Sequence, residues 1–219
     1  MKKLSYIVLM IACMLPMFAT AQTKKIKETF NADDKIRFEW EEYVDKKGGV
    51  EIKDNCLNIT NKDKNTSRMV FTNLPISVKN SFKVSTSIIV PNLNDKEWFA
   101  ITFDNTKDHH KMAFYIKENF FRFKEIKIDY TDDDFEEYDP TMARITTIWQ
   151  DRRIPIKLKG GKNITVNFII EKKGENLIIS INNMKVDELP VGDDLKSANL
   201  GFIVSGNYSL KIDEILVEQ

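Results

Sequence analysis

The sequence has 219 residues, 33 basic and 33 acidic side chains, 42% hydrophobic residues and 2 cysteines. The apolar content is too high and the net charge too low for a disordered chain. Two cysteines cannot hold together a disulfide-rich mini-scaffold, and a formal net charge of zero gives no whole-chain attraction to nucleic acid. The length fits one domain, because β-sandwiches often reach about 200 residues.

Residues 1–21 are predicted to be a signal peptide. Two lysines precede an apolar run over residues 4–18, and Ala19-Thr20-Ala21 supplies the small residues of a cleavage site. The run is shorter than the ~20 residues of a membrane-spanning helix, and Cys13 has a poor lipobox around it. We therefore expect export to the periplasm, the cell surface or the medium. We expect no lipid anchor and no transmembrane segment in the mature chain, residues 22–219.

Cleavage after Ala21 would leave 198 residues with 31 basic and 33 acidic side chains, a net charge of −2. Cys56 would then be the only cysteine, so no disulfide within the chain would be possible. A lone cysteine is usually buried and unreactive in an oxidising compartment. We expect this for Cys56, on a strand that includes its neighbours Leu57 to Ile59.

Hydrophobic and polar residues alternate along most of the mature chain, which is the period of a half-buried strand. On the last predicted strand the apolar register shifts between Ile212 and Ile215. No helical period is visible outside the signal peptide, and we count about 12 to 14 strands. The clearest predicted strands, in chain order, cover 81–90, 97–104, 111–117, 163–171, 175–182 and 208–217.

Glycine and asparagine punctuate these strands. Asn182-Asn183 is predicted to form a two-residue hairpin turn, because asparagine tolerates a positive φ. The strands from Ile164 to Val186 therefore form a predicted meander. No linker or repeat divides the chain, so we expect residues 22–219 to form one all-β domain, a two-sheet antiparallel β-sandwich.

Two segments interrupt the alternation and are predicted to be long loops. Residues 129–139 hold seven acidic residues in eleven, and Trp149 precedes Asp151-Arg152-Arg153. Loops at the ends and edges of a sandwich often carry function. The acidic segment is therefore a candidate contact surface.

Four groups of residues share the pattern of one known family. They are Phe30-Asn31-Ala32-Asp33 with Trp40, residues 49–52 and residues 56–59; residues 99–104 with 115–117; residues 163–166 with 177–183; and residues 200–204 with 210–215. Together they resemble the concanavalin A-like lectin/glucanase jelly-roll domains of secreted bacterial proteins, over roughly residues 25–219. The resemblance implies the jelly-roll fold more strongly than any activity, because one fold hosts many functions.

Glycoside hydrolases of this family carry carboxylates spaced Glu-x-Asp-x-x-Glu on one strand, and a retaining mechanism needs the pair ~5–5.5 Å apart. That spacing is missing from this sequence. Residues 125–129 have the wrong interval, and residues 213–218 lack the middle acid. The resemblance therefore favours a protein without hydrolase activity, with displaced carboxylates as the alternative.

Carbohydrate-binding jelly rolls often hold a structural calcium ion with an acid from the first strand and an aspartate from the last. Glu28 and Asp213 stand at similar places here, so the resemblance implies a possible calcium site. The alternative is that Asp213 caps a turn or pairs with Lys211.

A zinc site is not expected: His109 and His110 are adjacent, and adjacent side chains on a strand point to opposite faces. We expect them in a polar hairpin loop with Asp104, Asn105 and Asp108.

Aromatic residues are the remaining functional lead, because sugars stack on tryptophan and tyrosine while polar groups fix their orientation. If Phe99 and Phe114 face the core, Trp98 and Tyr115 face outward. Arg122, Trp149 and Arg152 are predicted to join them, although large aromatics also fill sandwich cores.

Three hypotheses follow. The first is an exported, non-catalytic protein that binds an oligo- or polysaccharide through Trp98, Tyr115, Arg122 and Trp149. The second is an envelope structural or protein-interaction module that uses residues 129–139. The third is a glycoside hydrolase with atypical carboxylates.

Overall fold

The computed structural model describes residues 24–31, 38–73, 75–78, 81–91, 96–105, 110–117, 120–128, 144–148, 152–154, 163–191 and 197–219. Within these ranges every regular element is a β-strand, and the described strands pair antiparallel. The signal peptide prediction, the acidic segment 129–139 and Trp149 lie outside the described residues. In the described part of the chain no helix is long and apolar enough to cross a membrane.

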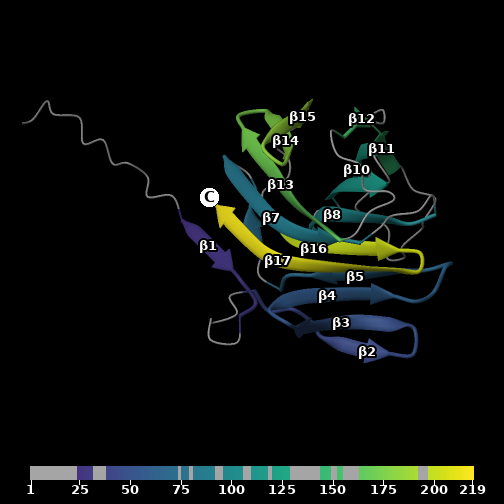
Figure 1. Cartoon of the computed structure of the whole chain (residues 1–219). Coiled ribbons are helices and arrows are strands. Elements are labelled where there is room, and N and C mark those ends of the chain that lie inside the picture. The colour runs from purple at the N-terminus through teal and green to yellow at the C-terminus, as the bar shows by residue number, and fades with distance from the viewer. Residues whose placement is uncertain are drawn as a thin grey trace, which may run out of the picture.

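The first sheet has nine strands and the C-terminal strand lies near its middle (Figure 1). In spatial order the sheet runs β15-β14-β13-β7-β17-β4-β3-β2, and β1 pairs with the second half of β17. Its strands are β1 (Lys25–Glu28), β2 (Tyr43–Asp45), β3 (Gly48–Lys53), β4 (Cys56–Asn61), β7 (Phe82–Val90), β13 (Ile164–Lys173), β14 (Asn176–Ile181), β15 (Met184–Pro190) and β17 (Tyr208–Glu218).

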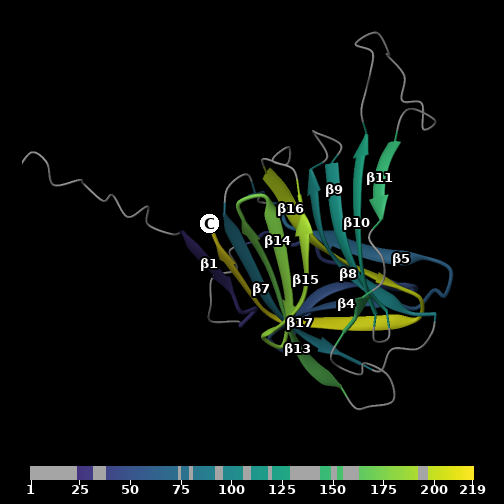
Figure 2. The same cartoon turned by 90° about the horizontal axis from the view of Figure 1, so that it is seen from above.

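The second sheet has eight strands and packs against the first (Figure 2). Its spatial order is β11-β10-β9-β8-β16-β5, with β12 beside β10 and β6 beside β16. Its strands are β5 (Ser67–Phe71), β6 (Ile76–Ser77), β8 (Trp98–Asn105), β9 (His110–Lys117), β10 (Phe120–Ile128), β11 (Arg144–Ile148), β12 (Arg152–Arg153) and β16 (Ser197–Ser205).

The core lies between the two sheets and is built from the alternate residues of each long strand. The rings of Phe99 and Phe168 meet edge to face across the sandwich at 5.8 Å, and those of Phe82 and Phe103 lie 5.5 Å apart. Full burial of one such side chain stabilises the fold by about 1.5–3 kcal/mol. The aromatic core therefore fixes which face of each strand is left outside.

The predicted alternation is confirmed along the long strands. On β7 the side chains of Phe82, Val84, Thr86, Ile88 and Val90 are all buried and those between them are half-buried. The shift on the last strand is also confirmed, because the β17–β7 ladder changes register between Ile212 and Glu214. Cys56 is a buried free cysteine, as expected, and burial raises the pKa of its thiol, with the nearby Asp213 charge adding to the effect.

Two parts of the prediction are corrected. The described residues hold 17 strands, more than the 12 to 14 expected, because β2, β6 and β12 are too short to show a period. The expected polar loop around the histidines is also wrong at His110, which begins β9 and is buried. Its Nε2 lies 2.7 Å from Glu125 Oε1 on β10, so the imidazole contacts a buried carboxylate where the prediction had it contact solvent.

An arginine–aspartate contact joins the two sheets at each side of the sandwich. On one side Arg68 of β5 pairs with Asp45 of β2, and its guanidinium also lies over the Tyr43 ring, 5.3 Å from the centroid. On the other side Arg152 of β12 donates from Nε to Asp187 of β15 at 3.1 Å. These pairs connect strands that lie at or beside the sheet edges.

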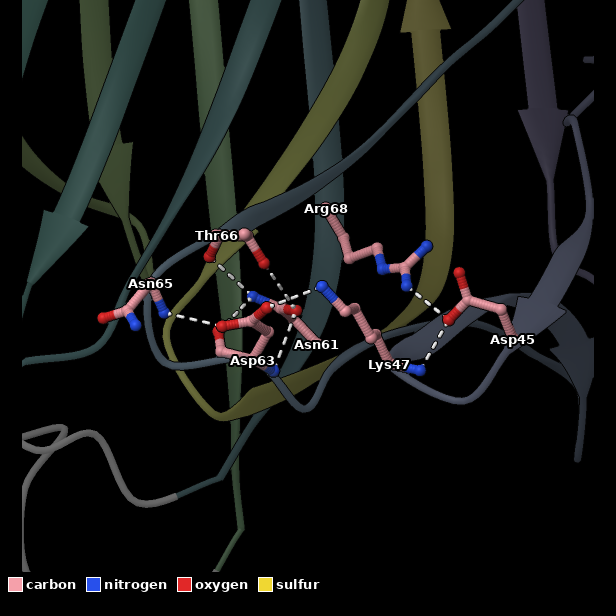
Figure 3. Close-up of polar contacts among 7 residues, drawn as sticks. All are labelled: Asp45, Lys47, Asn61, Asp63, Asn65, Thr66 and Arg68. Atoms are coloured by element: carbon pink, nitrogen blue, oxygen red, sulfur yellow. Dashed lines mark hydrogen bonds and ion pairs between the residues drawn. The ribbon is translucent and has the colours of Figure 1, made fainter.

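The pair formed by Arg68 belongs to a larger polar cluster around the β4–β5 loop (Figure 3). Asp45 also accepts the backbone N–H of Lys47, whose ammonium lies 3.2 Å from Asp63. Asn61 donates from Nδ2 to the carbonyl oxygens of Asp63 and Thr66. The cluster thus fixes the connection by which the chain crosses from one sheet to the other.

Candidate functional site

The outer face of the eight-stranded sheet collects the predicted aromatic residues. Since Phe99, Ile101 and Phe103 point into the core, Trp98, Ala100, Thr102 and Asp104 of β8 point outward. The register of the sheet extends the same face to the neighbouring strands. It carries Lys111, Ala113, Tyr115 and Lys117 of β9, Phe120, Arg122, Lys124 and Ile126 of β10, and Asn199, Gly201, Ile203 and Ser205 of β16.

Trp98 and Tyr115 lie together on this face. Their ring centroids are 5.1 Å apart and the planes meet at 62°, an edge-to-face arrangement. Both side chains are partly exposed, and each comes from a different strand of the β8–β9 pair. The β8–β9 pairing places the two backbones side by side and the rings contact each other, so the pair presents one aromatic surface.

Arg122 lies directly across from Tyr115 on the next strand, and its side chain is exposed. Phe120, which is 40% exposed, stands opposite Lys117 on the same face. The structure thus brings three of the predicted site residues, Trp98, Tyr115 and Arg122, to one region. Sequence reasoning missed Phe120, because its place opposite Lys117 depends on the β9–β10 register.

Small residues occupy the positions between these aromatic groups. Ala100 and Ala113 are fully buried beneath their neighbours on the outer face. Gly201 lies where a Cβ atom would meet the Phe71 ring at 2.4 Å, so the ring rests directly on the backbone of β16. Thr102 satisfies its hydroxyl by donating to the carbonyl oxygen of Met112 at 3.0 Å.

Carboxylates are scarce on this face. Among the outward positions of the described strands β5, β8, β9, β10 and β16, only Asp104 is acidic. Its carboxylate lies 3.2 Å from the ammonium of Lys111. A two-carboxylate site for glycoside hydrolysis is therefore not formed by the described residues of this face.

The other predicted site residues have different surroundings. Trp149 lies outside the described residues. Arg152 pairs with Asp187 at the edge of the sandwich, and its strand position, opposite Phe121, is not in register with the outer-face residues.

Glu28 and Asp213, the predicted calcium ligands, come from the neighbouring strands β1 and β17, and Glu28 stands opposite Ile215, two residues beyond Asp213. Glu28 is buried and accepts the backbone N–H of Phe38 at 3.1 Å, whereas Asp213 is exposed at the bulge of β17. Among the described residues, no group of three or more His, Cys, Asp or Glu side chains could hold a metal ion. Calcium takes six to eight oxygen ligands, so two carboxylates would be an incomplete set and calcium stays a prediction.

Comparison with known proteins identifies the fold. A glycoside hydrolase family 16 endo-glucanase from Bacteroides ovatus matches with 14% identity and a TM-score of 0.58, over 87% of this chain and 98% of the other. The carbohydrate-binding module CBM66 from Bacillus subtilis matches with 10% identity and a TM-score of 0.52, over 80% and 91%. A protein with a galectin-like fold, also from Bacillus subtilis, matches with 9% identity and a TM-score of 0.62, over 90% and 98%.

No protein-family model matches the sequence, and no curated protein matches it either. At such low identities the structural likeness establishes the fold and nothing finer. The chain has the concanavalin A-like jelly-roll fold of glucanases and lectins, as its resemblance implied.

Proposed function

We propose that the mature protein is exported and binds a carbohydrate chain on the outer face of its eight-stranded sheet, without cleaving it. The observation that carries this proposal is the pairing of Trp98 with Tyr115 at 5.1 Å, with Arg122 in register beside them. Sugar rings have apolar faces that pack on such aromatic groups, and an arginine can donate several hydrogen bonds to their oxygens.

The fold supports a glycan as the ligand. The structural neighbours include an endo-glucanase and a carbohydrate-binding module, whose names describe action on glycans or binding to them. Both kinds of protein share this sandwich, so the choice between cleavage and binding depends on the residues of the site.

Those residues favour binding. Glycoside hydrolysis generally uses two carboxyl groups, ~5–5.5 Å apart in retaining enzymes and ~6.5–9.5 Å apart in inverting ones. The outward positions of β9 are Lys111, Ala113, Tyr115 and Lys117, and the acid on β8, Asp104, is paired with Lys111. The described face thus supplies aromatic and basic groups in place of the acid and base.

A glycan array with the mature protein tests the proposal. We expect binding to at least one polysaccharide class, and we expect the double variant Trp98→Ala, Tyr115→Ala to weaken it by about tenfold or more, a loss of ~1.4 kcal/mol. Tyr43→Ala is the matched control, because Tyr43 is a partly exposed aromatic residue of the other sheet. Binding that survives in the double variant, or is absent from the wild type, would contradict the proposal.

The non-catalytic part needs its own assay. The protein, at high concentration, is incubated with the polysaccharides that it binds, and new reducing ends are measured over a day. We expect no release above the buffer. Release that scales with protein concentration and persists through repurification would establish the hydrolase alternative.

Export is tested at the N-terminus. Protein recovered from cells that make the full chain should begin at Gln22, because cleavage is expected after Ala21. An intact N-terminal Met1 in the cytoplasmic fraction would contradict it.

A further inference from the structure

The described outward positions of the eight-stranded sheet are more basic than the chain as a whole. Its described positions hold one acid, Asp104, but several bases on β9, β10 and β12. The mature sequence after residue 21, by contrast, has a net charge of −2. The bases on the face are Lys111, Lys117, Arg122, Lys124 and Arg153.

Two of these lysines are not neutralised within the described structure. Lys111 forms an ion pair with Asp104 and lies over the Phe71 ring, 5.5 Å from its centroid. Lys117 and Lys124 have no ion-pair partner among the residues that the structure describes. Lys117 is exposed and Lys124 is partly exposed. Among the described residues, no acidic side chain competes with an external anion for their ammonium groups.

These lysines flank the aromatic pair. Lys124 stands opposite Ala113, one position along the face from the Tyr115–Arg122 pair, and Lys117 follows Tyr115 on β9. Residues two apart on a strand are separated by about 6.6–6.8 Å. The bases thus form a band beside Trp98 and Tyr115 that a ligand lying on those rings would also meet.

We propose that the bound glycan is an anionic polysaccharide, one whose sugar units carry carboxylate or sulfate groups. This inference rests on the proposed glycan-binding function and names its ligand class. Rings alone would accept neutral and charged sugars alike, whereas Lys117 and Lys124 add attraction only where the ligand carries negative charge. Because both lysines contact solvent, salt weakens that attraction.

The experiment measures affinity for two matched pairs of polymers that differ only in charge. Polygalacturonate is compared with its fully methyl-esterified form, and dextran sulfate is compared with dextran. We expect the charged member of at least one pair to bind about tenfold more tightly, and the two pairs distinguish carboxylate from sulfate. This preference should fall as the NaCl concentration rises.

The variant Lys117→Gln, Lys124→Gln is the specific test. We expect it to lose most of the preference for the charged polymer, about fivefold or more in affinity. The control Lys46→Gln, Lys53→Gln removes the same charge from exposed positions on or beside β3 of the other sheet and should change affinity by less than about twofold. Equal losses in the two variants would overturn the inference, because net charge would then explain the binding.

Other outcomes separate the inference from the proposed function. Equal binding of charged and neutral polymers that is lost in Trp98→Ala, Tyr115→Ala would overturn the anionic ligand and leave glycan binding intact. No binding to any polysaccharide would overturn both. Binding to duplex DNA as tight as to the charged polymers would also overturn the inference, since the face would then be a general polyanion surface.

Discussion

Gly48 has no room for a side chain. It begins β3 with a φ of +124°, and a Cβ atom there would lie 2.0 Å from the carbonyl oxygen of Thr60 on the neighbouring strand. Since backbone cannot move aside without breaking the ladder, Gly48→Ala should lower the free energy of unfolding by about 3 kcal/mol, from strain and overpacking together. Urea denaturation measures this loss.

Gly174 provides the matched control. It also has a positive φ, +59°, but a Cβ atom there would meet nothing within 4 Å. Gly174→Ala should therefore cost only ~1 kcal/mol, the price of the left-handed conformation. Similar losses for the two variants would mean that the close contact at Gly48 relaxes.

Glu28 has a structural task whether or not it binds a metal. Its buried carboxylate accepts the backbone N–H of Phe38, so Glu28→Ala leaves that amide without this acceptor. We expect a loss of about 1–3 kcal/mol in urea denaturation, and a smaller one for Glu28→Gln, which keeps an acceptor oxygen. A loss below ~0.5 kcal/mol for the alanine variant would mean that water replaces the carboxylate.

Calcium binding by Glu28 and Asp213 is tested in the same protein. If the prediction is right, added Ca²⁺ raises the melting temperature of the wild type and EGTA reverses it, because a ligand of the folded state stabilises it. Asp213→Asn should reduce that response. An unchanged melting curve at millimolar Ca²⁺ would contradict the prediction.

At the scale of elements, hairpin turns fix the register of the strands. Asn182 and Asn183 have φ values of 49° and 64°, the geometry that two-residue turns between right-twisted strands require. Asn183→Gly should raise the free energy of unfolding by a few tenths of a kcal/mol, because glycine adopts a positive φ without strain. Asn183→Ala should lower it, and thermal melting of the two variants distinguishes the effects.

Much of the strand pattern and its register could be predicted from the sequence. The alternation on β7 and the register shift after Ile212 both appear in the order of the residues, since a buried face forces a period of two. The turn at Asp54-Asn55, with φ values of 53° and 56°, was missed, although its asparagine tolerates a positive φ as those of the Asn182-Asn183 turn do. Short strands such as β6 were missed because two residues cannot display a period.

For the candidate site, the exposure of the aromatic residues could be predicted from the sequence, but their contacts could not. Alternation indicated that Trp98 and Tyr115 face outward, and both are partly exposed. Their contact, and the position of Arg122 across from Tyr115, depend on which strands pair and in what register. Lys117 and Lys124 went unnoticed because, on a single strand, a lysine between apolar residues is typical of any solvated face.

At the scale of the whole molecule, the contact of Arg68 with Asp45 makes the stability of the fold depend on pH. The hydrogen bond from Arg68 is the main cause that holds the pKa of Asp45 below its usual value, with the Lys47 amide next. A lowered pKa gives stability that is present above the unfolded value of about 3.9 and is lost as the pH falls through the folded value. Asp45→Asn should therefore reduce the drop in melting temperature between neutral pH and pH ~3.

Glu51→Gln is the control for this prediction, because Glu51 is an exposed acid on β3 of the same sheet. It should leave the acid-induced drop closer to that of the wild type. If the two variants respond alike, general charge repulsion explains the acid sensitivity, and the Arg68–Asp45 contact makes no specific contribution to it.

The central place of β17 has a consequence for how the chain acquires its structure. Tyr208–Glu218 pairs with β4, β7 and β1, and Lys25 near one end of the described chain is in register with Glu218 near the other. Such pairings between distant segments close late, because a long loop must first be ordered. During synthesis from the N-terminus, the first sheet lacks the strand that joins its two halves until residues 208–218 have been made. We expect a ribosome-bound nascent chain that lacks residues 208–219 to be sensitive to protease. A longer nascent chain, in which these residues have left the ribosome, should be resistant.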